Sequence, residues 1–284
     1  MFQHAVDRAL SLTSCDRTIV IAASQHRLSL DSQLRGRALR KLILQPANRD
    51  TAAGIFLPLA YVRSRDPNAI VVIHPSDHFI YPEARFLVTL RRAVQAVEMM
   101  PQRLLLLGVQ PDRLETEYGW IHRGICLDGS PRHRIHAVAS FLEKPDTELA
   151  DQALQGGALW NTLILIARVE SLWQAGRECF PDIVSLFEQF APVWDTRDEL
   201  TTLESVYRKV PAYNFSSHLL QRAPEKVAVM ELADVLWSDW GKPERIAETL
   251  RRIGRIPAFP LRCLDRPFIP HQIREDADQA TASA

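Results

Sequence analysis

Cysteine is scarce in this sequence, with four residues in 284. The four, at positions 15, 126, 179 and 263, lie far apart and form no paired spacing. This pattern fits neither a zinc ribbon nor a small disulfide-stabilised scaffold. A chain with this cysteine usage is typical of a reducing compartment, so we expect a cytoplasmic protein.

Long apolar runs are missing as well. No stretch approaches the roughly 20 apolar residues that a membrane-spanning helix needs. Residues 1–8, Met-Phe-Gln-His-Ala-Val-Asp-Arg, contain no basic segment followed by an apolar run, which is the pattern of a secretory signal. The sequence therefore predicts neither a membrane partner nor secretion.

The sequence also has no excess of positive or negative charge. Lys and Arg number 34 and Asp and Glu also number 34, so no overall field attracts a polyanion, and we expect no nucleic-acid partner. A phosphate site would have to be built locally. His133 and His136 lie close together but have no cysteine or acidic residue at metal-site spacing, so they are predicted to be surface residues.

Short apolar runs rich in Val and Ile alternate with stretches of helical period, which predicts an α/β fold with a mostly parallel sheet. The expected strands are 18–22, 42–44, 69–73, 104–108, 137–142, 159–167 and 227–232. The expected helices are 51–65, 83–100, 168–177, 181–191, 197–208 and 242–253. The strands of the first half are continuously apolar, which favours burial of both sheet faces. Residues 274–284 are polar and small, and are predicted to be disordered.

Asp77 follows directly after one of these apolar strands, in the segment Ile-His-Pro-Ser-Asp-His at 73–78. Ligands of open α/β sheets bind at this end of the strands, and a carboxylate there can hold Mg²⁺. Pro, Ser and Asp also end strands and cap helices, so a simple turn is an equally good interpretation.

A second carboxylate, Asp239, lies between Trp237 and Trp240, which suggests a rigid and partly desolvated acid. If Asp77 and Asp239 converge, they form a metal site with two carboxylates. The local pattern slightly favours the alternative, in which Asp239 caps the following helix.

Two further segments combine polar groups with the end of a strand. Glu143 and Lys144 are adjacent and of opposite charge, and they would point to opposite faces if the chain stays extended. One could bind sugar hydroxyls and the other a phosphate, although a surface charge pair is the commoner case. Residues 45–53 open a helix with Asp50 or Thr51 as N-cap. Their polar groups can read a base edge or can simply form a capped loop.

Gly119 and Asn161 are weaker signals. Gly119 lies in a short aromatic stretch, where backbone can approach a ligand closely. Asn161 is embedded in an apolar strand, so its carboxamide needs either a ligand hydroxyl or a neighbouring backbone group.

Taken in order, these segments resemble the sugar-1-phosphate nucleotidyltransferases of the mannose-1-phosphate guanylyltransferase type, over about residues 1–253. The resemblance implies a Rossmann-like, GT-A-like α/β domain with a mixed, mainly parallel sheet and helices on both faces. About 1–130 would form the nucleotide side, about 131–253 the sugar-phosphate side, and 254–284 a C-terminal extension. The implied substrates are GTP and mannose 1-phosphate, and the implied metal is Mg²⁺. Whether the chain forms a homo-oligomer is left open.

The family motifs also imply individual roles. The implied nucleotide-binding residues are Gln45, Pro46, Asn48, Arg49, Asp50, Thr51, Ser76 and Asp77. The implied sugar-phosphate residues are Gly119, Glu143, Lys144 and Asn161. The implied catalytic residues are Asp77, Lys144 and Asp239, of which Asp77 and Asp239 would bind the metal.

Three departures from the family pattern qualify this interpretation. Asp50 stands where better-known members have Asn, which leaves the base open. The family's Ser-X-Asp…Met-Glu segment has its counterpart in residues 214–221, which lack both carboxylates and leave the sugar open. None of the 11 glycines forms the family's Gly-X-Gly-X-Arg-Leu phosphate loop. The first strand and this loop are absent from the 284 residues, so we expect impaired turnover.

Three hypotheses follow from the missing loop. The first is an active guanylyltransferase whose loop is encoded before Met1 or has been removed. The second is a non-catalytic homologue that binds a sugar nucleotide and acts as a regulator or scaffold. The third is a degenerate product that folds poorly.

Overall fold

The computed structural model describes residues 1–127 and 134–256. The chain divides into two compact units, Met1–Trp237 and Ser238–Ala284, each of which is described by itself. His133, Cys263 and the stretch 274–284, which the sequence predicts to be disordered, lie outside the described residues. The predicted domain boundary at residue 253 stays a prediction.

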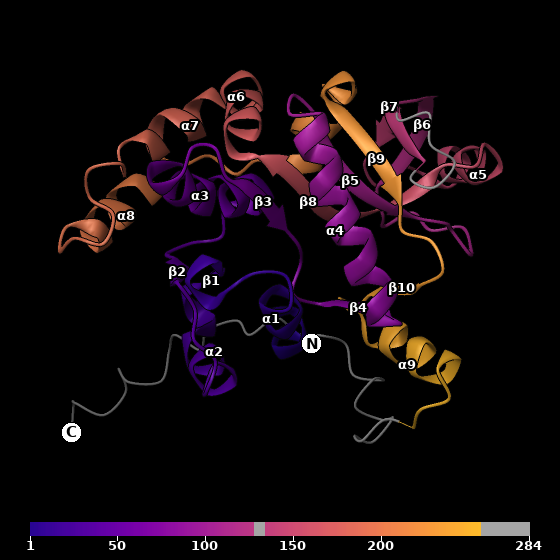
Figure 1. Cartoon of the computed structure of the whole chain (residues 1–284), viewed down its shortest axis with the longest axis horizontal. Helices are drawn as coiled ribbons and strands as arrows, with labels where there is room; N and C mark the ends of the chain where they lie inside the picture. The colour runs from indigo at the N-terminus through magenta and orange to yellow at the C-terminus, as the bar shows by residue number, and fades with distance from the viewer. Residues whose placement is uncertain (128–133, 257–284) are drawn as a thin grey trace, which may run out of the picture. The chain divides into compact units, whose positions relative to one another are not determined.

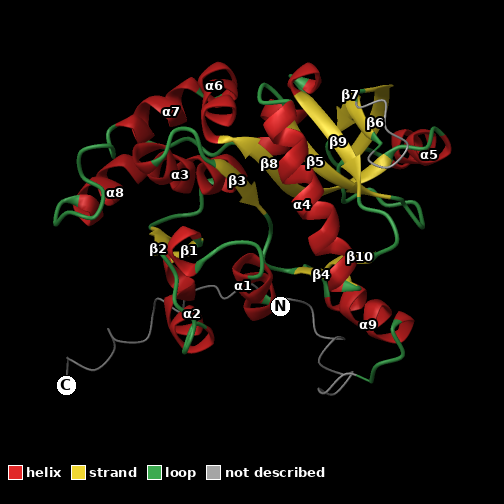
Figure 2. Cartoon of the chain, in the orientation of Figure 1, coloured by secondary structure: helices red, strands yellow, loops and turns green. Residues whose placement is uncertain are grey.

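Strands and helices are interspersed along the first unit (Figures 1 and 2). Its strands are β1 (Ile19–Ala23), β2 (Lys41–Gln45), β3 (Ile70–Ile73), β4 (His78–Tyr81), β5 (Leu104–Val109), β6 (Trp120–Cys126), β7 (Ile135–Leu142), β8 (Leu159–Arg168) and β9 (Val227–Glu231). Its α-helices are α1 (Phe2–Leu10), α2 (Arg27–Gln33), α3 (Asp50–Arg65), α4 (Glu83–Met99), α5 (Thr147–Gln155), α6 (Val169–Cys179), α7 (Pro181–Glu188) and α8 (Glu199–Tyr207). Strand β10 (Leu236–Asp239) crosses into the second unit, which contains α9 (Pro243–Arg252).

The main sheet has six strands in the order β3-β8-β5-β9-β7-β6. Strands β5 and β9 are parallel, whereas β8 is antiparallel to both β3 and β5, and β7 is antiparallel to both β9 and β6. A separate parallel pair is formed by β1 and β2. The mixed α/β class is thus confirmed. The expected predominance of parallel pairs does not hold in the six-stranded sheet, because β8 and β7 each run back between neighbours of opposite direction.

Helices cover both faces of the six-stranded sheet, as β5 shows most clearly. Leu104 and Leu106 belong to one core with residues of α3, α6 and α7, whereas Leu105 and Leu107 belong to a second core with residues of α4 and α5. Successive strand residues point to opposite faces, so both faces of β5 are buried. Burial is less complete than expected for β1 and β3, which are half-buried along their whole length.

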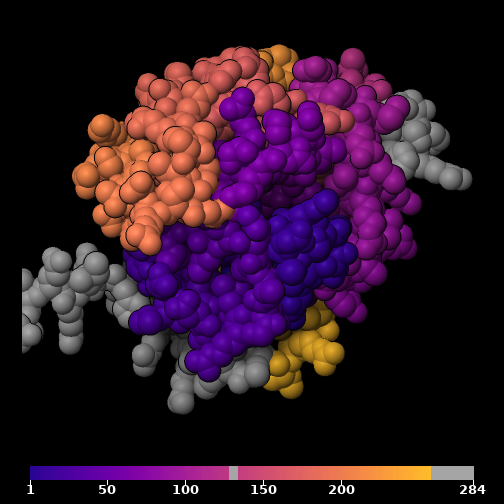
Figure 3. Space-filling view, turned by 60° about the vertical axis from the view of Figure 1, so that its left-hand side comes forward, coloured from indigo at the N-terminus to yellow at the C-terminus, as the bar shows by residue number. Residues whose placement is uncertain are grey.

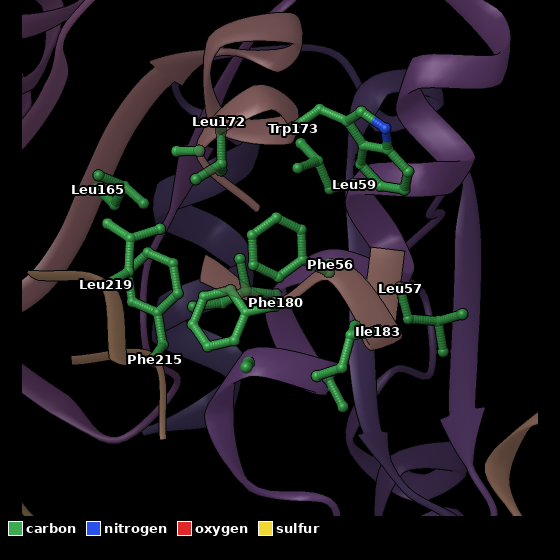
Figure 4. Packing of buried hydrophobic residues seen from close by; sticks show 14 of the residues in the cluster. Phe56, Leu57, Leu59, Leu165, Leu172, Trp173, Phe180, Ile183, Phe215 and Leu219 are labelled. Atoms are coloured by element: carbon green, nitrogen blue, oxygen red, sulfur yellow. The ribbon is translucent and has the colours of Figure 1, made fainter. Parts of the chain in front are cut away.

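The first core is rich in aromatic rings. Phe56 of α3 is fully buried, and its ring lies within 6.3 Å, between centroids, of the rings of Trp173, Phe180 and Phe215. Figure 4 shows these side chains packed around one another with the leucines of the same cluster. Helices α3, α6 and α7 are thereby fixed against the sheet, and with them the start of α3, which carries polar residues.

An ion cluster ties the β1–β2 pair to the segment before α8. The Lys41 Nζ lies 2.6 Å from Oδ1 of Asp195 and 2.6 Å from Oε2 of Glu199. In the space-filling view the N-terminal segments, in indigo and purple, lie beside the orange residues near position 200 (Figure 3). Strand β2 therefore has a fixed position relative to α8, and both contribute to the site described next.

Candidate functional site

A cavity of about 710 Å³ opens where β2 and β3 end and α3 begins. It lies within the first unit, at the carboxyl ends of these strands, where α/β proteins commonly bind ligands. Its lining residues are Gln45, Asn48, Asp50, Thr51, Gly54, Ile55, Ile73, His74, Pro75, Leu163 and Ala212.

The start of α3 is held by hydrogen bonds among its own polar residues. The Asn48 Oδ1 accepts from the Asp50 backbone N–H at 2.9 Å, and the Asp50 Oδ1 accepts from the Thr51 N–H at 2.6 Å. Asp50 has φ 58°, in the left-handed region. The prediction of Asp50 or Thr51 as N-cap is wrong: the helix begins at Asp50, and Arg49 takes the N-cap position without a side-chain cap bond. The helix thus begins one residue earlier than it would with Asp50 as N-cap.

Gln45 and Thr51 are oriented by residues far away in the sequence. The Tyr207 hydroxyl donates to the Gln45 Oε1 at 2.8 Å. Burial raises the pKa of Tyr207, so this hydroxyl stays protonated as a donor. With its oxygen engaged, Gln45 directs its amide nitrogen toward Gly54 on the cavity wall, 3.9 Å from the position of a Cβ there. The Thr51 Oγ1 accepts from the Phe215 N–H at 2.8 Å.

The cavity contains four of the residues implied for the nucleotide: Gln45, Asn48, Asp50 and Thr51. The other four, Pro46, Arg49, Ser76 and Asp77, are not among its lining residues. Arg49 donates from Nε and Nη2 to the Tyr207 carbonyl oxygen, at 3.2 and 3.0 Å, and so fastens the loop to the end of α8. His74 and Leu163 line the cavity but were not predicted, because only Ser76 and Asp77 were selected from residues 73–78 and Leu163 is an apolar strand residue.

A second cluster brings together three of the implied sugar-side residues. The Asn161 N–H donates to the Gly119 carbonyl oxygen at 2.8 Å. A Cβ on Gly119 would lie 3.2 Å from the Glu143 Oε2 and 2.7 Å from Phe141, so the absence of a side chain permits this close approach. The buried Asn161 satisfies its Oδ1 with the Leu163 N–H at 3.0 Å, which is the neighbouring-backbone alternative.

The turn after β7 gives Glu143 an unusual environment. Burial raises the pKa of Glu143 and the charge of Asp50 adds to this effect, whereas Lys144 and a hydrogen bond with Ser216 oppose it. Leu163 lines the cavity, and its N–H donates to the Asn161 Oδ1, so the cavity and the second cluster adjoin. The expectation of an extended chain here is wrong, because Lys144 has φ 45° and turns the backbone.

Residues of the divergent segment 214–221 also belong to this cluster. The Gln221 Oε1 accepts from the Glu143 backbone N–H at 3.1 Å, and Ser216 bonds the Glu143 side chain. In the sequence, this segment was notable only because it lacks the two carboxylates of the family pattern. Its neutral side chains instead support Glu143 without adding charge beside a carboxylate that is already partly desolvated.

We predict that Glu143→Gln changes the pH dependence of stability. Because the folded pKa of Glu143 is raised above its ordinary value of 4.5, its contribution to stability is present below that value and is lost as the pH rises through the folded pKa. Relative to the variant, the wild type should therefore lose free energy of unfolding as the pH rises through this window. Urea denaturation of both proteins between about pH 4 and pH 8 measures this difference. Glu148→Gln, at an exposed position, is the control. Parallel curves for wild type and Glu143→Gln would contradict the prediction.

Asp77 follows β3 beside a firmly anchored histidine, and its side chain is 54% exposed. The Trp237 indole N–H donates to the His78 Nδ1 at 3.3 Å, and Arg8 donates to the His78 carbonyl oxygen at 2.9 Å. Burial lowers the pKa of His78 to about 3, so this imidazole is neutral near pH 7. Asp77 thus stands on a rigid backbone while its oxygen atoms reach solvent, which suits a ligand of a hard cation.

Asp239 belongs to the second unit and is held on both oxygens. Its Oδ1 accepts from the Gly241 N–H at 2.6 Å, and its Oδ2 accepts from Arg245 at 3.1 Å. The helix-capping alternative is wrong, because Lys242 is the N-cap of α9 and no side chain caps it. Carboxylate oxygens are ligands that suit Mg²⁺, and the guanidinium of Arg245 already neutralises part of the negative charge of Asp239. Since the two aspartates lie in separately described units, their convergence stays a prediction.

Two absences among the described residues bear on the site and its surroundings. Within 1–127 and 134–256, no three or more His, Cys, Asp and Glu side chains are grouped so that they could hold a metal ion. In the same part of the chain, no helix has the length and apolar character required to span a membrane.

Comparison with known families and proteins gives a consistent result. The model of a family described as Nucleotidyl transferase matches residues 1–254. The chain is 30% identical over 247 residues to mannose-1-phosphate guanylyltransferase ManC of Salmonella typhimurium, covering 85% of this chain and 50% of that protein. It is 26% identical to a mannose-1-phosphate guanylyltransferase of Escherichia coli, covering 85% and 52%. The chain thus spans about half the length of these relatives.

Solved structures with the same fold include the mannose-1-phosphate geranyltransferase from Thermus thermophilus, with a TM-score of 0.75 and 22% identity, covering 90% of this chain and 69% of that chain. The mannose-6-phosphate isomerase from Helicobacter pylori has a TM-score of 0.69 and 21% identity, covering 84% and 90%. At these identities the likeness concerns the fold, and it supports the α/β architecture described above.

Proposed function

Because this chain belongs to the nucleotidyl transferase family, we propose that it transfers a guanylyl group from GTP to mannose 1-phosphate, forming GDP-mannose and pyrophosphate. The observation that carries the proposal is the adjacency of two groups of residues within one unit. The cavity with Gln45, Asn48 and Asp50 adjoins the cluster of Gly119, Glu143 and Asn161. The names of the relatives support the choice of base and sugar.

In the proposed reaction a phosphate oxygen of the sugar phosphate attacks the α-phosphorus of GTP in line. A new oxygen–phosphorus bond forms, the bond to the bridging oxygen of the β-phosphate breaks, and pyrophosphate leaves with the electron pair. The attacking oxygen is already anionic, so no side-chain base is required and catalysis consists of positioning and charge neutralisation. Lys144 would offset the charge of the attacking phosphate, while Gly119, Glu143 and Asn161 would bind sugar hydroxyls.

Asp77 and Asp239 are the residues proposed to hold Mg²⁺, both being carboxylates with oxygen atoms suited to a hard cation. When bound, the ion would neutralise phosphate charge. The 284 residues contain no Gly-X-Gly-X-Arg-Leu loop, and one lost donor at a developing charge can cost about 3 kcal/mol of barrier. We therefore propose that these 284 residues on their own turn over slowly.

Calorimetric titration of the purified chain tests the proposal, using GTP, mannose 1-phosphate and GDP-mannose with and without Mg²⁺. We expect binding of all three ligands, together with slow release of pyrophosphate when GTP and mannose 1-phosphate are mixed. If none of the three ligands binds, the proposal is overturned. Tight binding with no pyrophosphate release would favour the alternative, a non-catalytic sugar-nucleotide-binding homologue that regulates or scaffolds a partner.

A further inference from the structure

Strand β3 is the outermost strand of the six-stranded sheet, and one of its edges is unpaired. Among the described residues, β3 is hydrogen-bonded as a strand only to β8, and β1 only to β2. Figure 1 shows β3 and the β1–β2 pair apart from each other. The backbone groups on these edges therefore lack the strand partner that such groups normally have within a sheet.

The register of β3 shows which of its backbone groups point away from β8. The Val169 N–H donates to the Ala69 carbonyl oxygen at 2.9 Å. Hydrogen-bonded and non-hydrogen-bonded residues alternate in an antiparallel pair, so every second residue from Ala69 onward bonds to β8. The N–H and C=O groups of the residues between them, Ile70 and Val72, point to the open edge.

The side chains of β3 are those of a central strand rather than of an edge strand. Its sequence is Ile-Val-Val-Ile, and that of β1 is Ile-Val-Ile-Ala-Ala. Neither contains the charged residue or proline by which natural edge strands avoid pairing with other chains. Both strands are only half-buried, although continuously apolar strands are usually buried on both faces. The edge is therefore suited to accept a further strand.

Both faces of the sheet are apolar beside this edge. Alternate residues of β3 pack against the first and the second core. Ile19 and Ile21 of β1 also pack against the first core. A strand added here has apolar neighbours on both faces, which favours an extended segment rich in Val and Ile over a polar one.

We propose that the open edge of β3 binds an extended apolar segment of a separate polypeptide as an added β-strand. The segment lies beside β3, on the side away from β8, and its backbone pairs with Ile70 and Val72. Because β2 and β3 both end at the cavity and β1 is parallel to β2, these three strands point the same way. A segment parallel to them brings its carboxyl-terminal end to the cavity. This inference does not depend on the proposed function.

Fluorescence anisotropy of a labelled synthetic peptide, titrated with the full 284-residue chain, tests the proposal. The peptide has a core of five alternating Val and Ile residues, the length of β1, flanked by lysines for solubility. We expect it to bind with a Kd on the order of 10 µM. The same peptide with backbone N-methyl groups keeps its side chains but loses its donors, so it should bind at least about 10-fold more weakly.

Val72→Pro tests the same contact from the protein side. It removes an N–H that points to the open edge and leaves the bonds to β8 intact, a position where an edge strand tolerates proline. Its affinity for the peptide should fall by about 5- to 20-fold. Val72→Ile keeps the N–H and should bind as the wild type does. If Val72→Pro fails to fold, the N-methylated peptide still decides the question with the wild-type chain.

Amide exchange measured by NMR locates the bound peptide. In the free chain the Ile70 and Val72 amides should exchange faster than those of Val71 and Ile73, and the peptide should slow them by about 10-fold or more. Equal binding of the N-methylated peptide, or no binding of the parent peptide at about 1 mM, would overturn the inference. Protection of the Ile70 and Val72 amides in the free chain would also overturn it, because another segment or a second copy of the chain then covers the edge.

Discussion

Replacing Phe56 with alanine is expected to lower the free energy of unfolding by about 3–5 kcal/mol, the range for removing a large aromatic side chain from a packed core. Phe56 is fully buried on α3, and its ring contacts rings from α6, from the residue before α7, and from the segment after α8. Elements from four parts of the sequence meet at this ring, so little of the cavity left by alanine can close by local movement. Urea denaturation of the purified chain measures the loss.

Gly176 provides an internal test of the same packing. A Cβ at this position would lie 2.3 Å from Cε1 of Phe56, so Gly176→Ala should cost about 1–3 kcal/mol by overpacking despite the better helix propensity of alanine. In the Phe56→Ala background the new methyl group enters the vacated space, and the same substitution should be neutral or stabilising. A double-mutant cycle measures this coupling.

The matched control is Val88→Ala, because Val88 lies on α4 with 43% of its surface exposed. We expect its effect on the free energy of unfolding to stay within about 0.5 kcal/mol. If Phe56→Ala fails to fold, Phe56→Leu keeps most of the volume and should give an intermediate loss. A loss below about 1 kcal/mol for Phe56→Ala would contradict the packing described here.

Local pattern predicted many of the elements, although it gave no expectation for α1, α2, α5, β4, β6 and β10. The helix expected at 83–100 is α4 (Glu83–Met99), and the strand expected at 159–167 is β8 (Leu159–Arg168). The continuous apolar run at 104–108 correctly predicted a strand buried on both faces. Direction of pairing was the part that failed, because it depends on which strand inserts between which neighbours and no local pattern encodes that order.

The same contrast between local patterns and long-range contacts applies to the candidate site. Gln45, Asn48 and Asp50 could be selected from the sequence because polar residues at a helix start are a local signal. The orientation of Gln45 could not, because it depends on Tyr207, which lies 162 positions away. The support of Glu143 by Gln221 is another long-range contact. The left-handed turn at Lys144 escaped prediction too, since the residue before a proline normally favours extended backbone.

That turn marks Lys144 as a residue whose position is specified by its surroundings. A non-glycine residue in the left-handed region is uncommon and carries a conformational cost, and Pro145 directly follows it. The turn places an exposed ammonium group next to Glu143, at the edge of the cluster proposed to bind the sugar phosphate. Such costs are retained where the surrounding structure imposes them, and they often occur at functional sites.

If the proposed function holds, Lys144→Ala is expected to lower kcat/KM for GDP-mannose formation by about 100- to 1000-fold relative to the wild-type chain, because it would remove the positive charge proposed to offset the attacking phosphate. Calorimetry should also show weaker binding of mannose 1-phosphate, a readout that does not depend on turnover. Lys144→Gly separates function from folding. Glycine adopts this left-handed backbone without strain, so its stability should match the wild type within about 1 kcal/mol while activity falls as in the alanine variant. Lys209→Ala, at an exposed position just after α8, is the charge-matched control and should have normal kinetics. If kcat/KM of Lys144→Ala stays within about threefold of the wild type, Lys144 does not neutralise charge in the reaction.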